Sequence, residues 1–144
     1  MPHATRDNLG YLLAKASQHW NELLQAGFAA EGFPEVKASY GSVLIPLFEE
    51  DELRMGEIAR RARLSKQTMT TMVRLCERDG LVERHPDAQD RRATRVRLTA
   101  RARRFRPAAE RVLAQLERDV HAMLGERRTR TVRRSLVELQ RLPR

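Results

Sequence analysis

Residues 53–99, LRMGEIARRARLSKQTMTTMVRLCERDGLVERHPDAQDRRATRVRLT, are the part of the chain that decides its fold. They contain two segments with the apolar spacing of amphipathic helices, at 55–62 and 65–79, joined by a tight turn. Two segments with strand-like character, 81–85 and 94–98, then enclose a charged loop. This order predicts a winged helix-turn-helix with a two-stranded β wing.

The second of these helices has one apolar and one polar face. Ser65 suits the position before the first turn, since its oxygen can accept from an exposed amide, and Gly80 suits the end of the helix. The apolar residues recur at helical spacing and are Met69, Met72, Val73 and Cys76. In the preceding helix, Met55, Ile58 and Ala59 should face inward.

The flanking segments predict helices on both sides of this unit. Apolar spacing favours one helix over 5–28, and a second over 36–49, in which Pro46 should cause a kink or a late start. A further helix should begin at Thr99 and break at Gly125, and a last one should cover 126–142. The fold class is therefore mainly α, and 144 residues favour one domain.

Composition excludes several classes of protein. No apolar run is long enough to span a membrane, and the first residues lack an apolar signal stretch, so we expect a cytoplasmic protein. The single cysteine, Cys76, cannot form an internal disulfide. The histidines His3, His19, His85 and His121 lack metal-ligand spacing, and no strained nucleophile turn is present. We therefore expect no metal, no cofactor and no enzymatic activity.

The positive charge is concentrated in the stretch quoted above. The formal net charge is +9, and residues 54–97 contain twelve Lys or Arg against six Asp or Glu, which is +6 of that total. Such a basic region favours a polyanionic partner, and nucleic acid is the commonest one in a cytoplasm. A solvated surface, in a chain from an arginine-rich proteome, is the alternative that charge alone leaves open.

Side chains that suit double-stranded DNA occur on the second helix and on the hairpin loop. Recognition helices read bases with their first turns, and an arginine on a narrow loop fits the minor groove. Asp90 can orient one guanidinium of the loop through a paired hydrogen bond. The predicted DNA-binding residues are Ser65, Lys66, Gln67, Thr68, Thr70, Thr71, Arg74, Asp90, Arg91 and Arg92.

These residues resemble the DNA-binding core of the MarR (multiple antibiotic resistance regulator) family of bacterial transcription factors. The most specific parts are GLVER at 80–84, the spacing of Asp87 and Asp90-Arg91-Arg92, and the closing Leu98-Thr99. The resemblance implies a homodimer, with 5–34 and 99–144 as helical dimerisation region and 35–98 as DNA-binding region. It also implies a pseudo-palindromic operator, and control by thiol oxidation or by a small aromatic or phenolic effector.

The resemblance has departures and open alternatives. Thr71 and Leu75 stand where many relatives have basic residues. Cys76 stands where relatives have a core leucine, which favours a cysteine packed in the core over a redox sensor. His19, Trp20 and Tyr40 are candidates for an effector cleft, although Trp20 also fits core packing. The prediction is a ligand-responsive repressor. Two alternatives stay open: a non-specific architectural DNA-binding protein, and a winged domain that binds protein.

Overall fold

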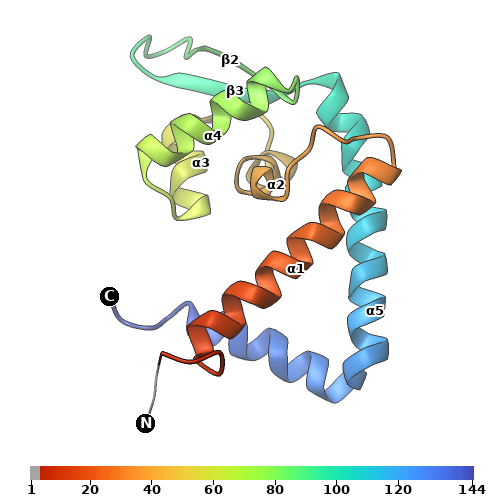
Figure 1. Ribbon diagram of the computed structural model, residues 1–144. Coiled ribbons are helices and arrows are strands. Elements are labelled where there is room, and N and C mark those ends of the chain that lie inside the picture. The colour runs from red at the N-terminus through yellow and green to blue at the C-terminus, as the bar shows by residue number, and fades with distance from the viewer. Residues whose placement is uncertain (1–3) are drawn as a thin grey trace. The chain divides into compact units, whose positions relative to one another are not determined.

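The computed structural model describes residues 4–144 and divides into two compact units. The first unit extends to Ala109 and the second is Glu110–Arg144. The elements, in chain order, are α1 (Leu9–Ala30), a 3₁₀ helix (Ala38–Tyr40), α2 (Gly41–Glu49), β1 (Leu53–Arg54), α3 (Met55–Ala62), α4 (Lys66–Arg78), β2 (Val82–Pro86), β3 (Thr94–Leu98) and α5 (Ala100–Leu139). The predicted winged helix-turn-helix is confirmed (Figure 1).

The helix pair forms as its local sequence predicts. The amide of Thr68 donates to Ser65 Oγ at 3.1 Å, which caps α4, and the helix ends at Arg78, followed by Asp79 and Gly80. Gly80 has a φ of 78°, a conformation that glycine adopts without steric cost. Between the two helices, Arg63 takes the left-handed conformation and ends α3. The sharp turn allows α3 and α4 to pack against each other.

Two helices begin later than the periodicity predicts. Helix α1 starts at Leu9 rather than at Thr5, because the Asn8 side chain accepts from the Tyr11 amide at 3.3 Å and caps it. Helix α2 starts at Gly41 rather than at Val36, and the 3₁₀ helix precedes it. A late start was one of the two outcomes expected from Pro46, which lies inside α2.

The wing is a three-stranded antiparallel sheet rather than a two-stranded hairpin. Its strand order is β1-β3-β2, with Leu53 opposite Val96 in one pair and Arg84 opposite Val96 in the other. The predicted bounds of the last strand, 94–98, are confirmed. The two-residue strand β1 was not predicted, since two residues carry no periodicity, and it fixes the hairpin to the start of α3.

The core of the first unit lies where the helix pair meets the sheet and α2. Ile58, Met69, Val73 and Val96 are each 0% exposed, as is Cys76. A second group of buried side chains is aromatic, with Phe105 of α5 at 4.8 Å from Phe28 and at 5.2 Å from Phe33, between ring centroids. Both contacts have the edge-to-face geometry that aromatic pairs favour.

The second unit contains the predicted break at Gly125. Gly125 has φ 81° and ψ 166°, so two helical arms meet there within α5. Arg133 on the later arm forms an ion pair with Glu117 on the earlier one. Across residues 4–144, every helix is too short or too polar to cross a lipid bilayer.

Candidate nucleic-acid interface

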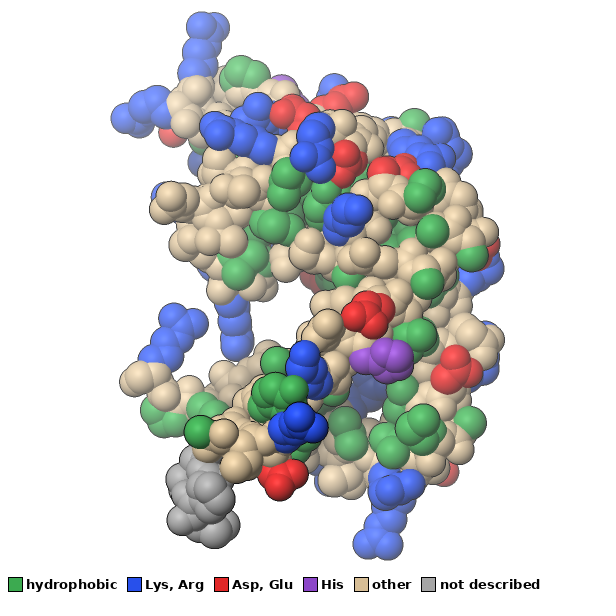
Figure 2. Space-filling model, viewed as in Figure 1, with side chains coloured by type: hydrophobic (Ala, Val, Ile, Leu, Met, Phe, Trp, Pro, Cys, Tyr) green, Lys and Arg blue, Asp and Glu red, His purple; other side chains and the backbone are tan. Residues whose placement is uncertain are grey.

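A groove of about 830 Å³ lies between α4, the start of α3 and the hairpin. Its lining contains five cations against two carboxylates, so the groove is basic. The lining residues are Arg54, Met55, Gly56, Glu57, Lys66, Thr70, Arg74, Arg84, Asp90, Arg92, Ala93 and Thr94. Figure 2 shows Lys and Arg side chains gathered at the upper left of the molecule, around the hairpin and the neighbouring helices.

Helix α4 turns its polar side chains outward, as the sequence predicts. Met69, Val73 and Cys76 are fully buried and Met72 is half-buried, so the apolar stripe faces the core. None of the seven predicted contact residues on and before this helix is buried. Thr70 is half-buried, and the other six are exposed. The exposed residues are Ser65, Lys66, Gln67, Thr68, Thr71 and Arg74.

The cations of the groove differ in how firmly they are held. Arg84 pairs with Glu77 at 3.0 Å, and Arg54 pairs with Asp87 at 2.9 Å. Within residues 4–144, the side chains of Lys66 and Arg74 have no recorded hydrogen-bond or ion-pair partner, and both residues are exposed on α4. They are therefore the cations of the groove that are available to bind an external anion without first breaking an internal pair.

The hairpin loop is organised around the Asp87 carboxylate, which is 1% exposed. Its Oδ1 accepts from the amides of Gln89 and Asp90 at 2.8 and 3.1 Å, which folds the loop back over the side chain. Its Oδ2 accepts from Arg54 Nε at 2.9 Å and from Arg95 Nε at 2.6 Å. These donors, first among them the Gln89 amide, lower the pKa of Asp87 well below its ordinary value of 3.8.

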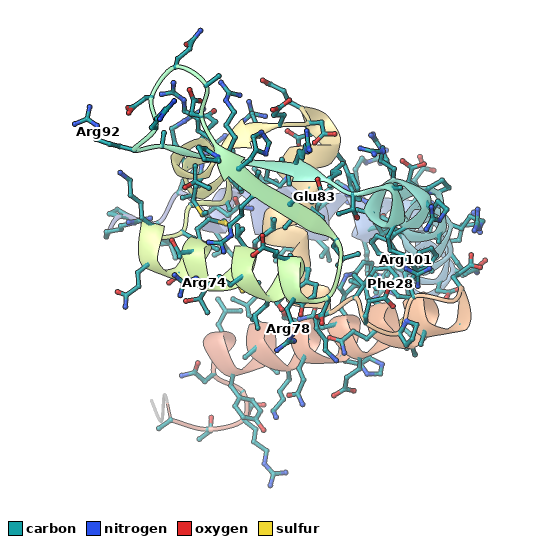
Figure 3. The ribbon with its side chains drawn as sticks, turned by 90° about the horizontal axis from the view of Figure 1, so that it is seen from above. Phe28, Arg74, Arg78, Glu83, Arg92 and Arg101 are labelled. Carbon is teal, nitrogen blue, oxygen red and sulfur yellow. The ribbon has the colours of Figure 1, made fainter. Side chains whose placement is uncertain are left out.

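The folded loop places Asp90 against Arg92. Asp90 Oδ1 accepts from the Arg92 amide at 3.1 Å and from its Nε at 3.3 Å, so the predicted contact between this carboxylate and one loop guanidinium is present. The Arg92 side chain is still 93% exposed. Figure 3 shows Arg92 at the end of the hairpin loop, on the opposite side of the first unit from Phe28 and Arg101. Arg91, beside it, is also exposed.

Asp87 is the functional candidate whose role sequence reasoning missed. The sequence pattern contains the spacing of Asp87 and Asp90 but predicts no partner for Asp87. The hydrogen bonds of Asp87 within the loop could have been predicted, because Asp often accepts from amides two and three residues later in a turn. Its ion pair with Arg54 could not, since Arg54 belongs to the unpredicted strand β1, 33 residues away in sequence.

The three effector candidates lie in different surroundings. His19 is exposed on α1, where its Nδ1 lies 3.8 Å from Glu22. Trp20, next to it, is half-buried. Tyr40 is 1% exposed, and its hydroxyl donates to Asp79 at the end of α4, so it already has a structural role between the segment before α2 and α4. No contact among the three is recorded in the described structure.

Replacing Tyr40 by phenylalanine should lower the free energy of unfolding by about 2 kcal/mol, because a hydrogen bond from a buried hydroxyl to a carboxylate is lost. Burial and the Asp79 carboxylate raise the pKa of Tyr40 to about 12, so the hydroxyl is protonated at neutral pH. Urea unfolding measures the effect, and Tyr11→Phe, at an exposed position on α1, is the matched control. Equal changes for the two variants would contradict the assigned role.

Cys76 should not react with thiol reagents in the folded protein. It is 0% exposed, and its burial, together with the charge of Asp79, raises the pKa of the thiol to about 12. At pH 8 we expect a maleimide to label Cys76 only after denaturant is added, with complete labelling of the unfolded chain as control. Rapid labelling of the native protein would reopen a redox role for this cysteine.

The described histidines, cysteine and carboxylates do not assemble into a metal site. No group of three or more such residues within 4–144 has an arrangement that could hold an ion. His85 instead pairs with Glu52 at 2.9 Å beside the sheet. His3, the first of the four histidines in the sequence, lies outside the described residues.

Residues 47–93, which include the helix pair and the hairpin loop, match the sequence profile of the MarR family. Within these residues the chain is similar to the MarR family. Its sequence is also 31% identical over 97 residues to the HTH-type transcriptional repressor YetL of Bacillus subtilis (strain 168). That match covers 63% of this chain and 56% of YetL, so the chain spans little more than half the length of this curated relative.

Solved structures that resemble this chain show that the similarity in fold extends beyond residues 47–93. The PcaV regulator from Streptomyces coelicolor, solved with its natural ligand, has a TM-score of 0.82 at 20% identity, covering 99% of both chains. The repressor CouR, solved on a 23-mer DNA duplex, has a TM-score of 0.79 at 23% identity, covering 98% of this chain and 99% of CouR. A MarR variant from E. coli with operator DNA has a TM-score of 0.78 at 21% identity, covering 94% of each chain.

Proposed function

We propose that the protein is a sequence-specific, DNA-binding transcriptional regulator that acts as a repressor and has no catalytic activity. The observation that carries the proposal is the basic groove between α4 and the hairpin, with unpaired Lys66 and Arg74 on one side and the exposed Arg92 on the other. Helix α4 would enter the major groove and Arg92 the adjacent minor groove. The repressor YetL and the DNA-bound relatives support this assignment.

The proposed contact set is the one that the sequence predicts. Lys66, Gln67 and Arg74 have side chains long enough to reach base edges, and lysine and arginine also bind phosphates. Asp90 orients Arg92 and does not itself approach the DNA, which is an anion. Repression follows from occupancy, because a protein bound across a promoter blocks the polymerase. Because a repressor must reach the genome, the proposal implies a cytoplasmic protein.

We also propose that the protein binds DNA as a homodimer through its terminal helices. Apolar side chains are exposed on α1 and, in the second unit, around and after Gly125, where water would otherwise cover them. The most exposed of them are Leu9, Tyr11, Leu12 and Leu23 on α1, and Met123, Val132, Leu136, Val137 and Leu142 in the second unit. A two-fold dimer predicts a pseudo-palindromic operator with half-sites about 10 base pairs apart.

Replacing Leu136 by glutamate should convert the dimer to a monomer without unfolding the chain, because Leu136 is already 45% exposed in the single chain. Light scattering after size exclusion measures the mass, and circular dichroism measures the helix content. Ile45→Glu on α2, 55% exposed and outside the terminal helices, is the matched control and should stay dimeric. A monomeric wild-type protein would contradict the dimer directly.

Binding selection from random duplexes tests the proposed function and separates it from its rivals. A regulator should enrich a symmetric motif, whereas an architectural DNA-binding protein should retain all sequences about equally. If the winged domain binds protein instead, no duplex should be retained at physiological salt. For the selected duplex, affinity should fall as salt rises, because bound Lys and Arg side chains release counterions from the phosphates.

We further propose that a small aromatic or phenolic effector controls DNA binding. The PcaV regulator, which has a similar fold and was solved with its natural ligand, supports control by a ligand. Such a ligand acts only if it binds the DNA-competent and incompetent dimers with different affinities. Half-buried Trp20 on α1 is the chain's only tryptophan and a built-in reporter. A series of phenolic acids that neither changes Trp20 fluorescence nor releases the selected duplex would remove the support for this part of the proposal.

A further inference from the structure

The adjacent threonines of α4 present a different chemistry from the long polar side chains around them. Thr70 Oγ1 donates to the Lys66 carbonyl at 2.8 Å and also lies 3.9 Å from Met55 Sδ, and Thr71 Oγ1 donates to the Gln67 carbonyl at 3.2 Å. A hydroxyl has a single hydrogen, so both hydroxyls are committed to acceptors within the protein. Neither threonine can donate to a base without giving up its internal hydrogen bond.

Their neighbour Thr68 shows the contrast. Its Oγ1 accepts from Ser65 Oγ at 2.9 Å, so the hydroxyl hydrogen of Thr68 has no recorded acceptor within residues 4–144. On the same helix, Lys66, Gln67 and Arg74 supply the long hydrogen-bonding groups. Thr70 lines the basic groove, and Thr71 is exposed one residue further along the helix. On both threonines the methyl group is thus the part of the side chain that no recorded hydrogen bond engages, with Thr70 half-buried in the groove lining and Thr71 exposed.

We infer that Thr70 and Thr71 determine sequence specificity by apolar contact between their methyl groups and the C5-methyl group of thymine. The major groove offers one apolar group of this kind, and it distinguishes thymine from the other three bases. The committed hydroxyls make the two threonines poor readers of purine N7 and O6, which need a donor. The inference rests on the proposed function, because it specifies what the recognition helix reads.

Deoxyuridine in place of thymidine tests the inference, because uracil lacks the methyl group and keeps every hydrogen-bonding atom. The probe is the selected duplex with deoxyuridine at each half-site thymine in turn, measured by fluorescence anisotropy. We expect affinity to fall about fourfold at each contacted thymine, the effect of one buried methyl group. Deoxyuridine outside the half-sites is the control for altered duplex flexibility and should change nothing.

Matched protein variants assign the effect to the threonine methyl groups. Thr71→Val and Thr70→Val keep the methyl and lose the hydroxyl, so they should bind the thymidine duplex and stay sensitive to deoxyuridine. Thr71→Ser and Thr70→Ser keep the hydroxyl and lose the methyl, so each should bind thymidine and deoxyuridine duplexes equally at its own position. Thermal unfolding confirms that each variant folds.

The outcomes separate this inference from the function on which it rests. Failure to bind any duplex overturns the proposed function and the inference together. Binding of a selected motif with equal affinity for thymidine and deoxyuridine duplexes overturns the inference alone. Serine variants that stay sensitive to deoxyuridine, or valine variants that lose sensitivity, also overturn it.

Discussion

Replacing Arg92 by alanine is expected to lower affinity for the selected duplex by about 10- to 100-fold, one of the two largest effects that we predict. Arg92 is 93% exposed yet held by Asp90, so its guanidinium reaches the DNA already oriented and loses little freedom on binding. A dimer loses two such contacts. Anisotropy titrations over a range of salt measure the change, and the salt dependence should become less steep by about one unit per lost phosphate contact.

Two controls separate contact from folding in this experiment. Arg97→Ala removes an arginine of β3 that pairs with Glu83 on the neighbouring strand, so the charge change is the same while the loop is left intact. Asp90→Ala leaves Arg92 in place but unoriented, and it should produce a smaller loss than Arg92→Ala. If Arg92→Ala leaves affinity unchanged at physiological salt, the proposed role of the wing is wrong.

Replacing Asp87 by alanine should weaken DNA binding at least as much as Arg92→Ala, although Asp87 itself is buried and touches no DNA. The carboxylate accepts from two loop amides and pairs with Arg54 and Arg95, so its loss releases the loop and leaves two guanidinium groups facing each other. The dimer should persist, since its proposed interface lies on the terminal helices. Affinity and mass, measured on the same preparation, check both statements.

Glu83→Ala is the matched control for Asp87→Ala, because it breaks an ion pair of the same hairpin between half-exposed side chains. Such surface pairs contribute little, so affinity should stay within about twofold of wild type. A large loss for both variants would mean that hairpin charge in general, rather than the loop built on Asp87, supports binding.

The lowered pKa of Asp87 also predicts how its contribution depends on pH. A carboxyl group that ionises more readily in the folded chain than in the unfolded chain stabilises the fold fully above its ordinary pKa of 3.8. This contribution disappears only as pH falls below that value and through the folded-state pKa. The stability difference between wild type and Asp87→Asn should therefore be constant from pH 5 to 8 and should shrink in more acidic solution.

Local sequence signals were sufficient for the helix-turn-helix. The spacing of Met69, Val73 and Cys76 predicts which face of α4 is buried, and Ser65 and Gly80 predict where the helix begins and ends, because capping and amphipathicity act within a few residues. The alternation at 94–98 likewise predicts β3. The predicted contact residues of α4 are exposed, or half-buried in the case of Thr70, for the same reason, since they occupy the positions that the apolar stripe leaves free.

Long-range contacts were decided only by the tertiary structure. The two-residue strand β1 forms because Leu53 and Arg54 pair with β3, which lies more than 40 residues later in the sequence. That pairing brings Arg54 into contact with Asp87. Tyr40 was a candidate for an effector cleft, and the fold buries its ring and ties its hydroxyl to Asp79. The sequence by itself determined the helix pair, the two strands of the hairpin and the faces that they bury, since these depend on near neighbours. The tertiary structure decided which charges meet, because a buried carboxylate is stable only where folding gathers its donors.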